Sequence, residues 1–531
     1  MTVRPRSGQG GQRAERSVFV SVPHGTSAGN MLRSGGLLDR LQEFDPTLQI
    51  VLLSPLVNDA AFVREFDRPG VRLVDLPPHR PSKLEARLTT LVQAAYLSRG
   101  RTESVRIRML EARASGIIRW VGVKGLIGRL VSAPFGGSPY ALTDRLVSHP
   151  AAETLFDQYR PVLIVCANPG LVFAEAPLMR TARRRGVPCM VIDASWDNFT
   201  NKLLPVRHVD RLVVWNDIIK DQALTIHGYD PKATRVTGAP QFDPHFRPQS
   251  RSTRDEFFRR VGADPTRRLI ALTTTPRSLY RHHDHVLREF DAAMSAGRLT
   301  NAQVLVRLHP RDEVHAYREF EGVPHIIIEK PFRSSVTVAD GLAIDVMPEH
   351  QRHLGDTLCH ADVVVNVAST ITIEACIFDT PVVNICFDGP EPEPYERSAT
   401  RYYSFDHYVN ITNRQAVRVA KSPAEMIQWV ARYLEDPALD AAGRKQVVLD
   451  QCQFTDGRSA ARVVACVLDE LAAGDASPQI AQMKANGSAS LVTGLFGPDP
   501  PFDPSSGRPE QRRGTPGETS SNASDTLRQS S

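Results

Sequence analysis

The stretch NVASTITIEACIFDTPVVNI, residues 366–385, combines two hydrophobic strands with a short helical segment between them. The first strand ends in a turn of small hydroxyl residues, and the helical segment contains one acidic residue. A short crossover between two hydrophobic strands is typical of a parallel sheet that is covered by helices on both faces. The fold class predicted from this stretch is therefore α/β.

The same alternation of β-rich runs and helical patterns extends outward from this stretch. Towards the N-terminus the β-rich runs lie at residues 17–23, 48–54, 71–76, 161–167, 187–193 and 210–216. After a segment rich in Gly and Pro, residues 233–246, they resume at residues 267–275, 302–310, 325–329, 361–369 and 380–387. We therefore predict two Rossmann-like doubly wound domains, an N-terminal domain over residues 17–237 and a C-terminal domain over residues 238–474.

Three segments depart from this alternation. Residues 1–16 contain four Arg, residues 475–531 are rich in Ser, Gly, Pro, Gln and Asn, and both termini are predicted to be disordered. Residues 83–135 are predicted to form a basic helical insertion, because eight basic and two acidic residues lie between residues 99 and 129. With Trp120 among its aliphatic side chains, this insertion either lies on an anionic membrane surface or is a solvated helix that packs on the domain.

Composition excludes several classes of protein. Hydrophobic residues make up 41% of the 531 residues, and no apolar run approaches the roughly 18 residues of a membrane span. The first sixteen residues lack the apolar segment of a secretory signal peptide, so we expect a cytoplasmic protein, at the inner face of the membrane if the insertion binds lipid. A net charge of +5 spread along the chain argues against a nucleic-acid-binding protein. The seven cysteines include no C-x-x-C pair and are expected to be reduced packing residues.

Polar residues follow two predicted strands of the second domain, where helix N-termini expose backbone N–H groups and ligands of parallel sheets bind. Ser369 and Thr370 can bind phosphate oxygens, and helix capping is their alternative role. Glu374 lies one position beyond that of a capping box, so capping does not explain it. Its carboxylate can accept hydrogen bonds from both hydroxyls of a ribose, and a solvated acid in the first helical turn is the alternative. His309 and Arg311 can stabilise a departing phosphate, and a structural hydrogen bond at the end of the strand is the alternative role of His309. These five residues are the candidate donor-binding residues.

The first predicted strand of the N-terminal domain ends in a turn of small residues. His24 is followed by Gly25, Thr26 and Ser27, which allow a ligand to approach the backbone closely. The turn matches neither G-x-G-x-x-G nor the Walker A pattern, so binding of NAD or ATP is not predicted. A plain strand–helix turn is the alternative interpretation.

The loop DASWDNFTNK, residues 193–202, groups two acids, a Trp, two Asn and a Lys within ten residues. The ring of Trp196 can stack on a sugar, and Asn198 and Lys202 can bind the polar groups of the sugar. These residues, together with Gly25 to Ser27, are the candidate acceptor-binding residues. A polar loop at the rim of the domain is the alternative.

One group of histidines has the composition of a metal site. His282, His283 and His285 lie in a predicted helix, where their side chains point in different directions. We therefore predict no metal site, and no motif indicates an organic cofactor.

Three short motifs resemble those of a known family. SWDNFTNK (195–202), HP (309–310) and AST followed by IEA (368–375) are similar to motifs of GT-B glycosyltransferases, in particular of bacterial surface-polysaccharide enzymes related to the CDP-glycerol glycerophosphotransferases. In architecture the resemblance extends over residues 17–470.

The resemblance implies two Rossmann-like domains that face a cleft. The C-terminal domain would hold the nucleotide donor and the N-terminal domain the acceptor, without a bound metal. It also implies that His24, Asp193 or Asp197 is the general base that takes the proton of the acceptor hydroxyl.

We therefore predict a transferase that moves a sugar, or a polyol phosphate, from a nucleotide-activated donor to a surface-polysaccharide or lipid-linked acceptor. Two alternatives stay open. A non-hydrolysing UDP-sugar 2-epimerase shares the fold and would alter its nucleotide sugar without an acceptor. A catalytically silent module would bind a glycan or a nucleotide without turnover.

Overall fold

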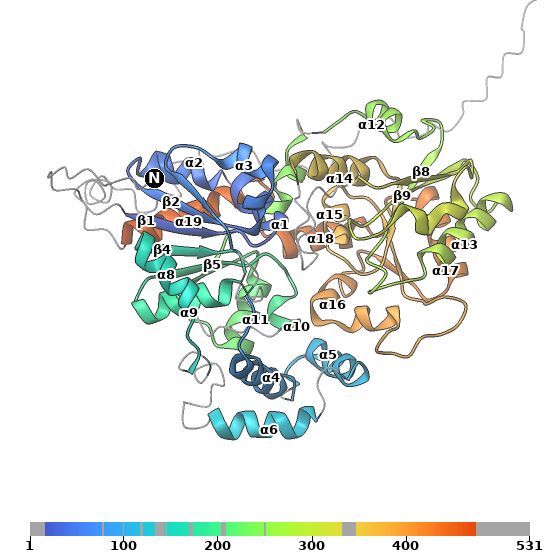
Figure 1. Cartoon of the computed structure of the whole chain (residues 1–531). Helices are drawn as coiled ribbons and strands as arrows, with labels where there is room; N and C mark the ends of the chain where they lie inside the picture. Colours follow the sequence, from blue (N-terminus) through green and yellow to red (C-terminus); the bar gives the residue numbers. More distant parts are fainter. Residues whose placement is uncertain are drawn as a thin grey trace, which may run out of the picture.

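The computed structural model describes residues 16–473, apart from residues 35, 77–78, 99, 117–119, 133–142, 144–145, 169–173, 203–208, 249–250 and 332–346. Apart from Arg16, the termini predicted to be disordered lie outside the described residues. The described strands form two parallel sheets that lie side by side (Figure 1). The predicted fold class, two doubly wound α/β domains, is confirmed.

The first sheet has seven strands in the order β3-β2-β1-β4-β5-β6-β7. Their bounds are β1 (Ser17–Ser21), β2 (Gln49–Leu53), β3 (Val71–Val74), β4 (Pro161–Cys166), β5 (Cys189–Ile192), β6 (Arg211–Val214) and β7 (Thr234–Val236). The direction of winding reverses between β1 and β4, and ligands of doubly wound sheets bind at such a switch point.

The second sheet has six strands in the order β10-β9-β8-β11-β12-β13. Their bounds are β8 (Arg268–Thr273), β9 (Ala302–Arg307), β10 (Ile326–Glu329), β11 (Val363–Asn366), β12 (Val382–Ile385) and β13 (Arg418–Ala420). Its switch point lies between β8 and β11. Every residue of β9 and β11 is buried, as expected for central strands covered on both faces.

Helices cover both sheets. In the first domain these are α1 (Gly25–Ser27), the π-helical turn η1 (Ala28–Arg33), α2 (Leu37–Phe44), η2 (Pro55–Asn58), α3 (Ala60–Phe66), α4 (Lys83–Leu97), α5 (Glu103–Ala114), α6 (Val121–Ser132), α8 (Pro150–Tyr159), α9 (Glu175–Arg185), α10 (Asn198–Asn201) and α11 (Asp217–His227).

The remaining helices follow β7. They are η4 (Pro240–Phe246), α12 (Arg254–Val261), α13 (His283–Ser295), η6 (Val314–Phe320), α14 (Pro348–His360), α15 (Ile371–Ile377), η7 (Ala399–Ser404), α16 (Asp406–Thr412), α17 (Pro423–Glu435), α18 (Ala441–Cys452) and α19 (Ser459–Ala473).

The predicted basic insertion is helical. It comprises α4, α5 and α6, and α6 lies against α4 on the side away from the first sheet (Figure 1). The exposed end of the helical insertion is therefore α6, whereas α5 lies beside α16 of the second domain.

The last helix differs from the predicted domain division, which placed residues 238–474 in one domain. Val463, Val467 and Leu471 of α19 pack in the apolar core of the first sheet with Val18 and Ile50. The apolar face of α19 is thus buried on the N-terminal domain, and the chain crosses between the two sheets twice (Figure 1). Hydrophobic periodicity marks an apolar face but does not say which sheet covers it.

Candidate active site

The loops after β8 and β9 form a polar corner at the carboxyl edge of the second sheet. The Thr274 hydroxyl accepts a hydrogen bond from the His309 N–H at 2.8 Å and donates one to Asp312 at 2.6 Å. The backbone N–H of Arg311 donates to Nδ1 of His309 at 3.1 Å. Burial, with the nearby charge of Arg311, lowers the pKa of His309 to about 4. A neutral His309 whose Nδ1 accepts carries its proton on Nε2, which can donate to an anion.

A cavity of about 510 Å³ lies between these two loops. Its lining includes Arg277 and Arg311, both exposed, together with Asp312 and Glu313. Cavities of about 300 to 1,000 Å³ are the usual size for small-molecule sites. Two guanidinium groups from adjacent loops can therefore bind one phosphate-containing ligand here.

Ser369 and Thr370 follow β11, on the other side of β8 from His309. Both are half-buried, and the Thr370 side chain does not cap α15, so the alternative capping role is absent there. Beneath them, Asn366 donates to the Ser369 hydroxyl at 3.3 Å and accepts from Asn384 at 2.5 Å. Tyr408 of α16 donates to Asn384 at 2.7 Å. This buried network fixes the turn and leaves the Thr370 hydroxyl for a ligand.

Glu374 is less accessible than the sequence predicted. One carboxylate oxygen accepts a hydrogen bond from Nε2 of His245 in the linker η4 at 2.9 Å, and the residue is 8% exposed. The predicted pair of hydrogen bonds to a ribose is therefore not available without release of His245. No described residue is seen to donate to the second oxygen, so one contact to a ribose hydroxyl is compatible with this geometry.

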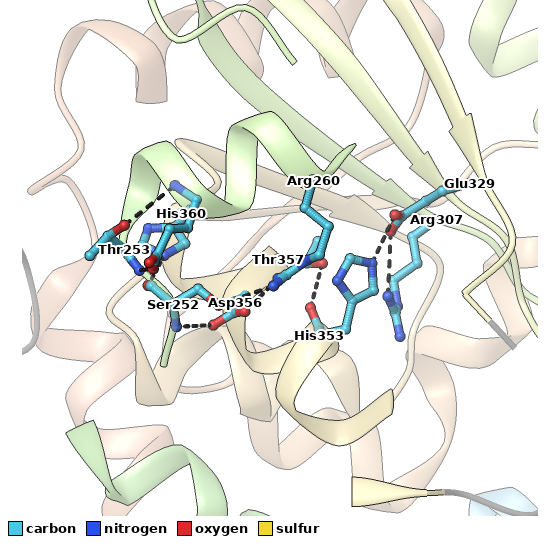
Figure 2. Close-up of polar contacts among 10 residues, drawn as sticks. Ser252, Thr253, Arg260, Arg307, Glu329, His353, Asp356, Thr357 and His360 are labelled. Carbon is cyan, nitrogen blue, oxygen red and sulfur yellow. Dashed lines mark hydrogen bonds and ion pairs between the residues drawn. The ribbon is translucent and has the colours of Figure 1, made fainter. Parts of the chain in front are cut away.

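Buried charges support the end of β9. Figure 2 shows Arg307 beside Glu329, at 3.4 Å, and His353 of α14 on the other oxygen of Glu329, at 2.8 Å. Burial lowers the pKa of Arg307, an effect opposed by the charges of Glu329 and Glu374.

At the first sheet, His24 lies at the switch point between β1 and β4. Its Nδ1 accepts the Ser27 N–H at 3.2 Å, and the Asn168 side-chain amide contacts its Nε2 at 3.1 Å. Burial, with the charge of Lys202, lowers the pKa of His24 to about 4. A neutral imidazole at this position can accept a proton. Gly25 and Ser27 are buried in this turn, whereas Thr26 is exposed.

Asp193 follows β5 and is 2% exposed. Its Oδ1 accepts a hydrogen bond from Asn198 at 2.5 Å, whereas its Oδ2 has no hydrogen-bond partner among the described residues. Burial raises the pKa of Asp193 to about 7, against the opposing effects of the Asn198 hydrogen bond and of Lys202. A carboxylate with such a pKa can take and release a proton near neutral pH.

Asp197 has a different environment. Burial alone would raise its pKa, but Lys202, at 2.9 Å, and a hydrogen bond from Ser195 outweigh burial and hold the pKa of Asp197 well below its usual range. A carboxylate that strongly favours its ionised form is a poor proton acceptor. The geometry therefore fits a positioning role for Asp197 better than the predicted role as base.

Trp196 is buried, with 6% exposure, and its ring packs edge-on against His407 at 4.9 Å and Tyr408 at 5.9 Å. With so little exposed surface the ring is not placed to stack on a sugar in this geometry, and the stacking role stays a prediction. Trp196 instead joins the loop after β5 to α16 of the second domain. The burial depends on a helix more than 200 residues away in the sequence, which sequence patterns do not reveal.

The histidines near residue 283 point in different directions, as predicted. His283 is buried and accepts the Thr275 N–H at 3.0 Å, whereas His282 approaches Glu393 at 3.5 Å. Elsewhere in the described part of the chain, His79, Glu85 and His149 place potential ligand atoms within 4.8 Å of one another. Arg180 donates to Glu85 at 2.9 Å, so a positive charge already neutralises that carboxylate.

Sequence reasoning missed a larger cavity of about 920 Å³ between the two domains. One wall is α5, with Arg108 and Glu111, and the other consists of the loops after β8 and β12, with Tyr280, Arg397 and Arg401. In the sequence, α5 and the two loops show a high density of charged residues, which by itself does not indicate a cavity. Their meeting depends on tertiary structure, because α5 lies far from both loops in the sequence.

A comparison with family models decides the class of protein. The model of CDP-glycerol:poly(glycerophosphate) glycerophosphotransferase matches residues 187–469, just over half of the 531 residues. The chain belongs to this family. It is therefore an enzyme, a transferase that uses a nucleotide-activated donor, as predicted from the sequence.

Among the solved structures that are similar to the transferase, three were determined with a nucleotide ligand. The S. aureus MnaA–UDP complex has 10% identity and a TM-score of 0.49, over 86% of this chain and 97% of that chain. UDP-GlcNAc 2-epimerase from Neisseria meningitidis bound to UDP-GlcNAc has 11% identity and a TM-score of 0.48, over 85% and 100%. The wall teichoic acid polymerase TagF soaked with CDPG has 10% identity and a TM-score of 0.45, over 86% and 89%. No curated protein matched the chain.

Proposed function

We propose that the transferase moves glycerol phosphate, or a related polyol phosphate, from its CDP-activated form to a hydroxyl of a surface polymer or lipid-linked acceptor. The observation that carries this proposal is the division between two sheet edges. His309 and Arg311 present hydrogen-bond donors for a diphosphate beside the 510 Å³ cavity. His24 and Asp193 lie at the edge of the first sheet, where burial shifts the pKa of each group so that its uncharged form is favoured.

The proposed reaction forms a bond between the acceptor oxygen and the phosphorus of the polyol phosphate. The bond from that phosphorus to the bridging oxygen of the diphosphate breaks, and CMP leaves with the electron pair. The base, Asp193 or His24, takes the proton of the acceptor hydroxyl. His309, Arg311, Ser369 and Thr370 bind the phosphate oxygens as charge develops on the leaving group, and Glu374 contacts the ribose through its second oxygen. Gly25, Thr26, Ser27, Asn198 and Lys202 border the acceptor side.

A nucleotide screen tests the donor. CDP should raise the melting temperature of the protein more than UDP or GDP at equal concentration, because a ligand that binds only the native state stabilises it. The variant Arg311→Gln should reduce the shift caused by CDP, and the exposed control Arg298→Gln, before β9, should not. Equal shifts with all three nucleotides would contradict the choice of CDP.

We further propose that α6 docks this enzyme on an anionic membrane surface. Within the described residues no helix is long and apolar enough to cross a membrane. The helix α6 packs closely on α4 through glycines: a Cβ at Gly125 would lie 2.8 Å from the carbonyl oxygen of Ala94. Its aliphatic residues instead face outward, and Leu126 and Leu130 are 54% and 64% exposed. Trp120, just before the helix, is 76% exposed.

The outward placement of these apolar side chains favours docking over the alternative of a solvated helix. The helix has Lys124 and Arg129 and no acidic residue, which suits an interfacial helix on anionic lipid. The variant Leu126→Glu/Leu130→Glu should abolish co-sedimentation with vesicles that contain phosphatidylserine. Leu449→Glu, on a helix of the other domain at 49% exposure, is the matched control. Equal sedimentation of both variants would contradict docking through α6.

A further inference from the structure

The linker helix η4 holds a histidine against a carboxylate of the second domain. His245 is 3% exposed, and its Nε2 lies 2.9 Å from one oxygen of Glu374, in the first turn of α15. Since an ionised carboxylate only accepts hydrogen bonds, Nε2 of His245 carries the proton and donates it. The Glu374 side chain keeps 11% of its surface exposed, and no described residue donates to its other oxygen. One oxygen is therefore fixed by His245, and the other stays available to a ligand.

The imidazole ring of His245 is closely packed. Phe378, at the end of α15, packs edge-on against it, with the ring centroids 5.3 Å apart. The helix α14 approaches so closely that a Cβ at Gly355 would lie 3.1 Å from Nδ1 of His245. The absence of a side chain at Gly355 therefore gives the imidazole its space. Contacts with α14 and α15 together fix the direction in which Nε2 donates.

The backbone of the linker is anchored on both sides of His245. Asp243 accepts hydrogen bonds from the backbone N–H groups of Ser459, at 2.9 Å, and Ala460, at 2.8 Å, where α19 begins. Arg251 donates to the carbonyl oxygen of His245 at 2.8 Å. These bonds hold the linker at the place where His245 meets α15.

We infer that His245 is a positioning residue for the donor: it holds the Glu374 carboxylate so that the free oxygen accepts a hydrogen bond from a ribose hydroxyl. The inference rests on the proposed function, because that function places a nucleotide beside Glu374, but it does not depend on the base of the nucleotide. A carboxylate that is already fixed loses less rotamer freedom when it binds a ligand, so its contact is stronger. The site should therefore prefer ribose to a sugar without hydroxyls, and this preference should depend on His245.

Calorimetry on the full chain with CDP and 2′,3′-dideoxy-CDP measures this preference. The wild type should bind CDP about tenfold more tightly, because the dideoxy sugar cannot donate to Glu374. His245→Gln, whose side-chain amide can replace Nε2 as the donor, should keep this ratio. His245→Asn is also polar but too short to reach Glu374, so its ratio should fall to about one. His245→Phe, which keeps the shape of the ring, should lose the ratio as well.

A double-variant cycle separates positioning from a purely structural role. Glu374→Ala alone should abolish the preference for ribose, and the addition of His245→Asn should weaken CDP binding no further, because His245 acts through Glu374. His360→Asn is the matched control. His360 is 5% exposed in the second domain, and its Nε2 contacts the carbonyl oxygen of Ser252 at 2.9 Å. This variant should keep the ratio of the wild type, whatever its melting temperature.

Equal binding of both nucleotides to the wild type would overturn the inference. So would an equal loss of affinity for both in His245→Asn, which is the result expected of a purely structural histidine. The same titrations with UDP and dideoxy-UDP separate the inference from the proposed function. If UDP binds more tightly than CDP and the ratio still depends on His245, the choice of CDP is wrong and the role of His245 stands.

Discussion

The carboxyl edges of the two sheets present different chemistry. At the first, acids and imidazoles are withdrawn from water: the pKa of Glu175 is raised by burial to about 8 and that of Asp193 to about 7, whereas that of His24 is lowered to about 4. At the second, the guanidinium groups of Arg277 and Arg311 remain exposed beside cavities. Burial disfavours the charged form of a side chain and so moves its pKa, whereas an exposed guanidinium keeps the positive charge that binds anions. We therefore propose that proton transfer takes place at the first domain and phosphate binding at the second.

The largest effect is expected from loss of the base. Asp193→Asn should lower turnover by a factor of about 100 to 10,000, because an amide cannot take the acceptor proton. Its affinity for CDP should be unchanged, since Asp193 lies on the other domain. Calorimetry with CDP and a transfer assay on the same sample measure both quantities. A loss of CDP affinity equal to the loss of turnover would break the division between the domains.

The pH dependence of kcat/KM identifies the base. We expect kcat/KM to rise with pH through about 7, because Oδ2 of Asp193 has no partner among the described residues and its carboxylate must be ionised to accept a proton. With His24 as the base, kcat/KM would already be at its plateau above about pH 5, because its pKa is about 4. A flat profile would therefore select His24 over Asp193.

Burial of Glu175 should make stability depend on pH. Its pKa of about 8 in the folded chain exceeds the ordinary value of 4.5, so the folded chain retains a proton that the unfolded chain releases. The free energy of unfolding should therefore fall as pH rises between these values, by at most about 1.4 kcal/mol per pH unit from this group. Glu175→Gln removes this contribution, and its stability relative to the wild type should increase from pH 5 to pH 8 on denaturant unfolding. A constant difference would contradict an uncharged Glu175, and the exposed variant Glu321→Gln is the control.

A smaller effect is expected at the phosphate-binding edge. His309→Ala should weaken CDP binding about tenfold through loss of one hydrogen bond to a phosphate oxygen. Turnover at saturating donor should fall much less than in Asp193→Asn. His285→Ala, a partly exposed histidine on α13, serves as the matched control. Unchanged CDP affinity in His309→Ala would remove this residue from the donor site.

The alternation of strands and helices sufficed to predict both sheets, because continuous apolar strands fit only a sheet covered on both faces. It also placed His309 and Ser369 at one edge, since parallel strands share their carboxyl ends. The environment of single side chains was less predictable. Trp196 is covered by α16 of the second domain, and this contact depends on how the two domains pack. Glu374 is held by His245, and this contact depends on how the linker η4 lies against α15. The sequence did not identify Arg277 as a candidate site residue, because the two cavities that it lines form only when loops from different strands meet.

Acceptor-dependent release of CMP tests the central claim most directly. The purified chain is incubated with CDP-glycerol in the presence or absence of oligo(glycerol phosphate), and nucleotides and oligomers are quantified by mass spectrometry. Our account predicts that CMP forms only with the oligomer, and that each CMP is matched by one glycerol phosphate unit added to the acceptor. Consumption of CDP-glycerol without an acceptor, or no CMP in its presence, would contradict it.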